Sequence, residues 1–138
     1  MKAYIAIKFH PDARNRDKIE KISQILKKSG IDTSCMIRDK ENWGKRKFTT
    51  KKLMQMTFKE IDKSDFIIID LTEKGVGLGI ESGYAYATKK PIIVIAEKES
   101  DISSTLAGIA SEVLLYDKIE DIYKLKILKH GKVKISEN

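Results

Sequence analysis

The segment VGLGIESGYA, residues 76–85, combines a run of glycines with a single carboxylate and follows the strand-like run Asp65 to Leu71. The alternating glycines just before and within it are Gly75, Gly77 and Gly79. In open α/β sheets, ligands bind beyond the carboxyl ends of the strands, and glycines there let the backbone approach a ligand closely. We expect Glu81 in the first turn of the following helix, where the helix dipole stabilises a carboxylate. A carboxylate at this position can also attack the anomeric carbon of a sugar.

The glycine spacing differs from two common phosphate-binding signatures, the G-x-G-x-x-G fingerprint and the P-loop. Gly77 to Ala85, with Lys90 to Val94 after it, instead resembles the signature of the nucleoside 2-deoxyribosyltransferases and the related deoxynucleoside 5'-monophosphate N-glycosidases. The resemblance has motif strength from Asp65 to Val94 and follows the order of elements over most of the chain. It implies that Glu81 is the nucleophile, which forms a glycosyl-enzyme ester that water or a second base resolves.

The resemblance also implies a set of substrate-binding residues. Tyr4 matches the tyrosine that opens the first strand, and Lys8 and His10 stand where phosphate-binding members place a serine and an arginine. The late segment Ser103 to Gly108 is similar to one that reaches a phosphate across a dimer interface in the family, which implies a homodimer. The substrate-binding candidates are Tyr4, Lys8, His10, Gly75, Gly77, Gly79, Ser103 and Ser104.

Two acidic positions of the family are changed in this sequence. The aspartate in the helix before the central strand matches Thr57, and the position six before the glutamate, an aspartate in transferases and a serine in phosphate-binding members, is Gly75. A general acid must reach the leaving base directly or through water. Asp70, at the end of the central strand, is the candidate to replace the missing catalytic acids. Alternatively, Asp70 is a cap or turn residue without a catalytic role.

Strand-like and helix-like segments alternate along the chain. The expected strands are Ala3 to Phe9, Thr33 to Ile37, Asp65 to Leu71, Pro91 to Ala96 and Val113 to Tyr116. Apolar residues at helical spacing predict helices that carry Ile19 to Leu26, Leu53 to Ile61, Gly79 to Thr88, Asp101 to Ala110 and Ile119 to Ile127. This order predicts an α/β, doubly wound, Rossmann- or flavodoxin-like three-layer sandwich with a mostly parallel sheet of about five strands. We expect one domain over residues 1–138.

The segment Arg38 to Lys52 is polar and basic and has no hydrophobic period. It exceeds the roughly 4 to 6 residues of a typical connection, so it is a candidate lid or binding segment. It holds the only tryptophan of the chain, Trp43.

The net charge of +7 raises the question of nucleic-acid binding. The basic residues are scattered, however, and the aromatic pattern of single-strand binders is missing, so nucleic acid is a disfavoured partner. The same positive field suits a phosphorylated small molecule. A nucleoside or nucleotide is therefore the expected ligand.

Other classes of protein are disfavoured by the composition. No apolar stretch approaches the roughly 20 residues of a spanning helix, and the N-terminal run is too short and too alternating for a signal peptide, so we expect a cytoplasmic protein without a membrane partner. The lone Cys35 cannot form an intramolecular disulfide. His10 has no second ligand nearby in the sequence, and we expect neither a metal nor a cofactor.

We therefore expect an enzyme that cleaves the N-glycosidic bond of a (deoxy)nucleoside or its 5'-monophosphate through Glu81, by hydrolysis or 2-deoxyribosyl transfer. The alternative is a catalytically degenerate protein of the same fold that binds or senses a nucleotide. A third hypothesis is nucleic-acid binding through Arg38 to Lys52.

Overall fold

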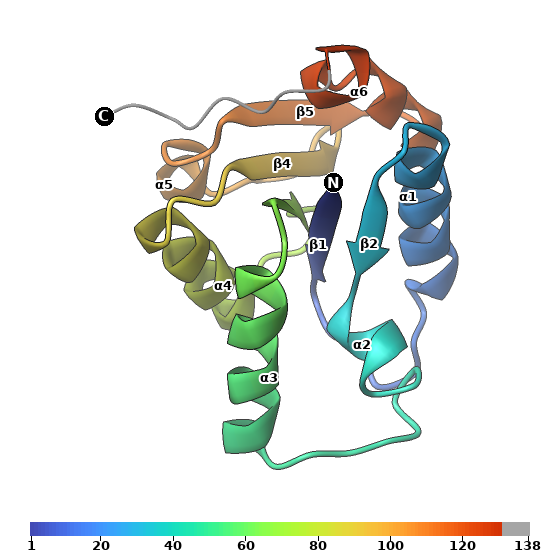
Figure 1. Ribbon diagram of the computed structural model, residues 1–138. Helices are drawn as coiled ribbons and strands as arrows, with labels where there is room; N and C mark the ends of the chain where they lie inside the picture. The colour runs from blue at the N-terminus through green and yellow to red at the C-terminus, as the bar shows by residue number, and fades with distance from the viewer. Residues whose placement is uncertain (131–138) are drawn as a thin grey trace.

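The computed structural model describes residues 1–130, which form a five-stranded sheet with helices on both faces (Figure 1). The strands are β1 (Lys2–Ile7), β2 (Asp32–Ser34), β3 (Phe66–Asp70), β4 (Ile92–Glu97) and β5 (Glu112–Tyr116). The helices are α1 (Arg16–Lys28), α2 (Met36–Asp39), α3 (Thr50–Asp62), α4 (Val76–Ala87), α5 (Ser104–Ala107), the 3-10 helix η1 (Ile119–Lys124) and α6 (Lys126–His130). Residues 131–138 of the expected single domain lie outside the described residues.

The strand order is β2-β1-β3-β4-β5, and all four neighbouring pairs are parallel. The chain winds outward from β1 in one direction and from β3 in the other, as in flavodoxin-like sheets, where ligands bind at the switch between the two directions. The expected doubly wound α/β fold is confirmed. The switch point lies between β1 and β3, the two strands that precede the candidate site.

The sheet separates two apolar cores because successive side chains of a buried strand point to opposite faces. One core joins the sheet to α1, η1 and α6, and the other joins it to α3, α4 and α5. In β1, Tyr4 faces the α3 and α4 side while Ile5 faces α1. In β3, Ile67 and Ile69 share the face of Tyr4, and all five residues of the strand are buried. This explains why β3 shows an apolar run without alternation in the sequence.

The flanking helices begin and end at chemically suitable residues. The Thr49 side chain caps α3 by accepting a hydrogen bond from the Lys52 N–H at 3.2 Å. Gly30, just after α1, adopts a left-handed φ of 78°, which glycine permits without strain.

Several predicted boundaries were wrong. The first strand ends at Ile7, two residues before the predicted end at Phe9. The second strand ends at Ser34, and Met36 to Asp39 forms the short helix α2 instead of continuing the strand. Helix α5 is a single turn capped by Ser103, and the closing segment divides into η1 and α6. Helix α4 begins at Val76, three residues earlier than expected. Gly77 and Gly79 are poor helix formers, but tertiary packing of the buried Leu78 outweighs their low propensity.

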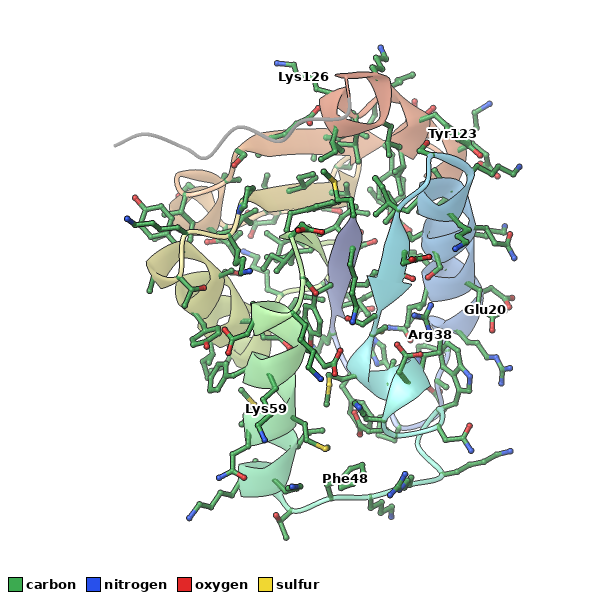
Figure 2. All side chains as sticks on the ribbon, in the orientation of Figure 1. Glu20, Arg38, Phe48, Lys59, Tyr123 and Lys126 are labelled. Atoms are coloured by element: carbon green, nitrogen blue, oxygen red, sulfur yellow. The ribbon has the colours of Figure 1, made fainter. Side chains whose placement is uncertain are left out.

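The long connection between α2 and α3 crosses the end of the sheet at which β1 finishes, and Figure 2 shows Phe48 on it. Arg38, in α2 just before this connection, points back into the fold and donates to Ser23 Oγ at 2.6 Å and to the Thr33 carbonyl at 3.0 Å. Trp43 packs against the α1 core, with the Arg16 guanidinium 4.6 Å from its ring centre. The first part of the connection is therefore attached to the body of the fold.

Within residues 1–130, no helix combines the length and apolar character that crossing a membrane requires.

Candidate active site

A hydrogen bond between Tyr4 and Glu81 joins the first strand to helix α4. The Tyr4 hydroxyl donates to Glu81 Oε1 at 2.7 Å. Tyr4 is fully buried in β1, and α4 packs over that face of the sheet through Leu78, Ser82 and Ala85. Glu81 is the sixth residue of α4 rather than part of its first turn, so capping of the helix dipole does not account for it. A specific polar contact to the sheet is what orients this carboxylate.

Burial sets the protonation behaviour of both side chains. Loss of hydration raises the pKa of Glu81 from its ordinary value of 4.5 to about 7, and the hydrogen bond from Tyr4 opposes this rise. Burial, and next the negative charge of Glu81, raise the pKa of Tyr4 well above its ordinary value. Tyr4 therefore remains a neutral donor at physiological pH, while Glu81 exists as both acid and carboxylate near pH 7.

Glu81 lies on the wall of a cavity of about 410 Å³, a size typical of small-molecule sites. The cavity is formed between β1, the start of α2, helix α3 and the first turns of α4. Its titratable side chains are Tyr4, Lys8, Cys35, Glu41 and Glu81. Burial raises the pKa of the Cys35 thiol to about 12, so this thiol is protonated and a poor nucleophile at neutral pH. The carboxylates on the cavity wall are Glu41 and Glu81.

Several predicted site residues meet in this cavity. The substrate-binding candidates on its wall are Tyr4, Lys8, Gly75 and Gly77, and Thr57 lines it as well. The Thr57 hydroxyl donates to the Leu53 carbonyl of its own helix at 2.8 Å. Gly75 has an extended φ of −163° and Gly77 is helical, so neither needs glycine for its backbone torsion. A β-carbon at Gly77 would meet no atom within 4 Å, so the space beside this glycine is open.

Asp70 does not join this group. Its side chain follows the face of Ile68, opposite to that of Tyr4, and it is 2% exposed. Tyr116 Oη donates to Asp70 Oδ2 at 2.7 Å, the Thr72 N–H donates to Oδ1 at 2.9 Å, and Lys18 Nζ lies 3.7 Å from Oδ2. Asp70 therefore has its partners on the α1 face, with the sheet between it and Glu81.

The remaining candidates lie outside the Glu81 cavity. His10 Nε2 is 3.1 Å from Glu73 Oε1, beside the small polar pocket around Asp70. Gly79 and Ser103 line a second cavity of about 590 Å³ between α4 and α5, to which Gly75 also contributes. Ser103 accepts a hydrogen bond from the Leu106 N–H as the cap of α5, and Ser104 is exposed on the first turn of that helix.

Sequence reasoning missed Glu41, a carboxylate on the wall of the Glu81 cavity. It belongs to the connection after α2, which the sequence marked only as a basic segment that could bind or cover a ligand. The available signal was that Asp39 and Glu41 are the only acids between Arg38 and Lys52. Asp39 pairs with Arg38 at 2.7 Å, which leaves Glu41 as the acid that faces the cavity. Among residues 1–130, no cluster of three or more His, Cys, Asp or Glu side chains is arranged to hold a metal.

Known proteins share the sequence pattern of this chain over nearly its full length. The model of the nucleoside 2-deoxyribosyltransferase family matches residues 3–131. The chain belongs to this family. The predicted resemblance is thereby confirmed, and the family's chemistry is N-glycosidic bond cleavage or deoxyribosyl transfer on nucleosides or nucleotides.

Individual similar proteins are distant in sequence but match over nearly their whole length. A protein of Thermofilum pendens with the provisional name 2'-deoxynucleoside 5'-phosphate N-hydrolase 1 is 24% identical over 140 residues, covering 96% of this chain and 98% of the relative. The structure of the 2-deoxyribosyltransferase from Bacillus psychrosaccharolyticus has a TM-score of 0.72 at 15% identity, covering 99% of this chain and 100% of that one. The CMP N-glycosidase of Clostridium botulinum has a TM-score of 0.64 at 17% identity, covering 90% and 96%. At these identities, the two structures establish the shared fold.

The buried charge of Glu81 should make stability depend on pH. The unfolded chain titrates this carboxyl near 4.5 and the folded protein near 7, so the free energy of unfolding of the parent falls as pH rises between these values. Glu81→Gln removes this loss. The variant should gain up to about 3 kcal/mol over the parent between pH 4.5 and about pH 8, at about 1.4 kcal/mol per pKa unit. Denaturant unfolding at several pH values measures it, with the exposed Glu120→Gln as control. A constant difference across this range would contradict a buried charge at Glu81.

Asp70 should matter for stability because its buried oxygens accept hydrogen bonds from two separate donors. The amide of Asp70→Asn has one acceptor oxygen, so one donor loses its partner and Lys18 loses a nearby opposite charge. We expect a loss of about 1 to 3 kcal/mol in the free energy of unfolding, measured by denaturant titration. Tyr116→Phe, which removes one donor and leaves the carboxylate, should cost less. Equal stability of parent and Asp70→Asn would refute this role.

Proposed function

We propose that this chain cleaves the N-glycosidic bond of a deoxynucleoside 5'-monophosphate, with Glu81 as the nucleophile. The observation that carries the proposal is the Tyr4–Glu81 pair on the wall of the 410 Å³ cavity. A carboxylate that is partly buried, held by one hydrogen bond and open to a cavity has the properties of a nucleophile at a sugar carbon. Membership of the nucleoside 2-deoxyribosyltransferase family supports the same chemistry.

In the proposed reaction, Glu81 attacks the anomeric carbon while the bond to the base breaks. Tyr4 holds Oε1 by its hydrogen bond, which leaves Oε2 as the attacking atom. The raised pKa of Glu81, about 7, makes the carboxylate a stronger base than an ordinary glutamate, and about half of it is ionised at neutral pH. The glycosyl ester formed on Glu81 is then resolved by water, which gives hydrolysis, or by a second base, which gives transfer.

The phosphorylated substrate is supported by Lys8. Its side chain lines the cavity, and its Cγ would lie 4.0 Å from a β-carbon at Gly75. No hydrogen bond or salt bridge occupies the Lys8 ammonium group among residues 1–130, so it can neutralise a phosphate. The Thermofilum pendens relative is named for a 5'-phosphate substrate and the Clostridium botulinum structure for CMP. Gly75 places no carboxylate beside Lys8.

We also propose that the active form is a homodimer that associates through the first turns of α4 and through α5. Val76 is 83% exposed and Ile80 47% exposed, which is unusual for large apolar side chains on neighbouring turns. Val76 lines the largely apolar second cavity, where Ser103 is also found. In a dimer, this face would be covered, and Ser103 would stand near the partner's substrate.

Thr57 and Gly75 favour one further candidate, a protein that binds a nucleotide without turnover. These two residues stand where catalytic family members carry polar or acidic side chains, and Thr57 bonds to its own helix. Such a protein would keep the cavity and Lys8 and would lack the proton transfer that the leaving base needs.

A direct assay separates catalysis from binding. The protein is incubated with each deoxynucleoside and each 5'-monophosphate, with and without a second free base, and released or exchanged base is followed by chromatography. We expect base release by the parent and a loss of at least about 10³-fold in both Glu81→Ala and Glu81→Gln, because each removes the nucleophile. Glu120→Gln serves as the matched control and should retain full activity. Tight nucleotide binding by the parent without base release would favour the binding protein instead.

Lys8 should govern the preference for a phosphorylated substrate. In Lys8→Gln, we expect kcat/KM for the 5'-monophosphate to fall about 10- to 100-fold, since a charge-assisted hydrogen bond contributes about 1.5 to 3 kcal/mol. The value for the unphosphorylated nucleoside should change little. Lys45→Gln, which removes an exposed lysine that does not line the cavity, is the control. An equal loss on both substrates would argue against a phosphate contact.

A further inference from the structure

When the N-glycosidic bond of the substrate breaks, the departing base needs a proton. The positions that the family resemblance assigns to catalytic acids are not acidic in this chain. Thr57 and Gly75 carry no carboxyl group, and Asp70 lies on the other face of the sheet with its own partners. An unprotonated nucleobase anion is a poor leaving group. A general acid that protonates it raises the reaction rate by about 10²- to 10⁴-fold. The required acid must line the same cavity as Glu81 and have a free carboxyl group.

Glu41 meets both conditions. It is partly buried on the wall of the Glu81 cavity, and within residues 1–130 its carboxyl group has no hydrogen bond or salt bridge. Its backbone is fixed on both sides: the Glu41 N–H donates to the Met36 carbonyl at 3.0 Å, and the Glu41 carbonyl accepts from the N–H groups of Gly44 at 3.0 Å and Arg46 at 2.9 Å. The side chain is thus held at the cavity by its backbone while its functional end remains available.

The chain reverses sharply just after Glu41. Asn42, Trp43 and Gly44 adopt left-handed φ values of 45°, 58° and 89°. This conformation costs a bulky residue such as Trp43 on the order of 1 kcal/mol or more, and packing of its ring against the α1 core and Arg16 offsets the cost. The turn keeps Glu41 at the cavity and sends the following basic residues away from it.

We propose that Glu41 is the general acid and base of this site, which protonates the departing base and later deprotonates the water that resolves the ester. The proposal rests on the proposed N-glycosidase function. In the first step, Glu81 Oε2 forms a bond to C1', the C1'–N bond breaks with its electron pair going to the base, and the Glu41 carboxyl gives the base its proton. In the second, water attacks C1', the ester bond returns its electrons to Glu81, and Glu41 takes the proton from water.

Burial supports this role because it raises the pKa of Glu41 above its ordinary value and so retains the proton that the first step uses. The charged and titratable groups around the same cavity are Tyr4, Lys8, Cys35 and Glu81. Tyr4 is committed to Glu81, and Lys8 is assigned to the phosphate in the proposed function. The pH profile of the reaction rate should have two limbs. Their apparent pKa values describe the Glu41 and Glu81 pair as a unit.

Two substrates with different leaving groups test the proposal. One is the deoxynucleoside 5'-monophosphate that the parent cleaves best, and the other is 4-nitrophenyl 2-deoxyribofuranoside 5-phosphate, whose leaving group departs without a proton. Glu41→Gln should lower kcat on the nucleotide by at least about 10²-fold and on the nitrophenyl substrate by much less. Glu81→Gln should lose activity on both substrates, and Glu120→Gln should keep activity on both. The pH profile of the parent on the nucleotide should lose one limb in Glu41→Gln. Formate should partly restore nucleotide cleavage in Glu41→Ala.

The possible outcomes distinguish failure of the Glu41 role from failure of the proposed N-glycosidase function. A parent that releases neither leaving group overturns the N-glycosidase function and the role of Glu41 together. A parent active on both, with Glu41→Gln slowed equally on the two substrates or on neither, overturns the role of Glu41 alone. If Glu41→Gln does not fold, as judged by circular dichroism, formate rescue of a folded Glu41→Ala supports the proposal. Its absence there overturns the proposal.

Discussion

Successive side chains of β1 and β3 point to opposite faces of the sheet, and both faces are buried, so strand alternation decides which polar groups can meet. Tyr4 is on the α3 and α4 face and reaches Glu81, whereas Asp70 is on the α1 face and reaches Tyr116. A shift of β1 against β3 by one residue would exchange these environments. The five paired positions between the two strands therefore fix the chemistry of both faces.

The two buried carboxylates illustrate how environment divides their roles. Asp70 is fully surrounded by donors and a nearby ammonium group, which suits a structural acid at the end of a strand. Glu81 has one donor and an open cavity, so its charge is incompletely stabilised in the folded protein. Such incomplete stabilisation lowers the stability of the fold and raises the basicity of the carboxylate. In the proposed reaction, this raised basicity is what Glu81 would use as a nucleophile.

Much of the fold followed from the sequence because hydrophobic periodicity is a local signal. Helices α1 and α3 and the buried β3 were predicted, and the resemblance to the family signature directed attention to Glu81. The sequence placed Asp70 correctly at the carboxyl end of the central strand. The face of the sheet to which its side chain points depends on pairing between strands that are far apart in sequence. The early start of α4 was missed because Leu78 packs against residues that the local pattern does not contain.

Glu41 was missed for a similar physical reason. It lies in a segment without periodicity, where local rules assign neither helix nor strand, and its position depends on a turn held by Trp43 against α1. Asp39 pairs with its neighbour Arg38, and Arg38 is itself held by a hydrogen bond to Ser23 Oγ on α1, a contact that the local pattern does not contain. A sequence alone shows that the acid exists but does not show that it faces a cavity.

Gly75 lines both cavities, and its backbone is extended rather than left-handed, so its torsions are open to any residue. A β-carbon there would make only an ordinary van der Waals contact with Lys8. An acidic side chain at this point would stand beside the lysine that we assign to the phosphate and would cancel its charge. A lineage of such proteins could therefore pass between charged and neutral substrates by changing one codon, with the rest of the fold intact.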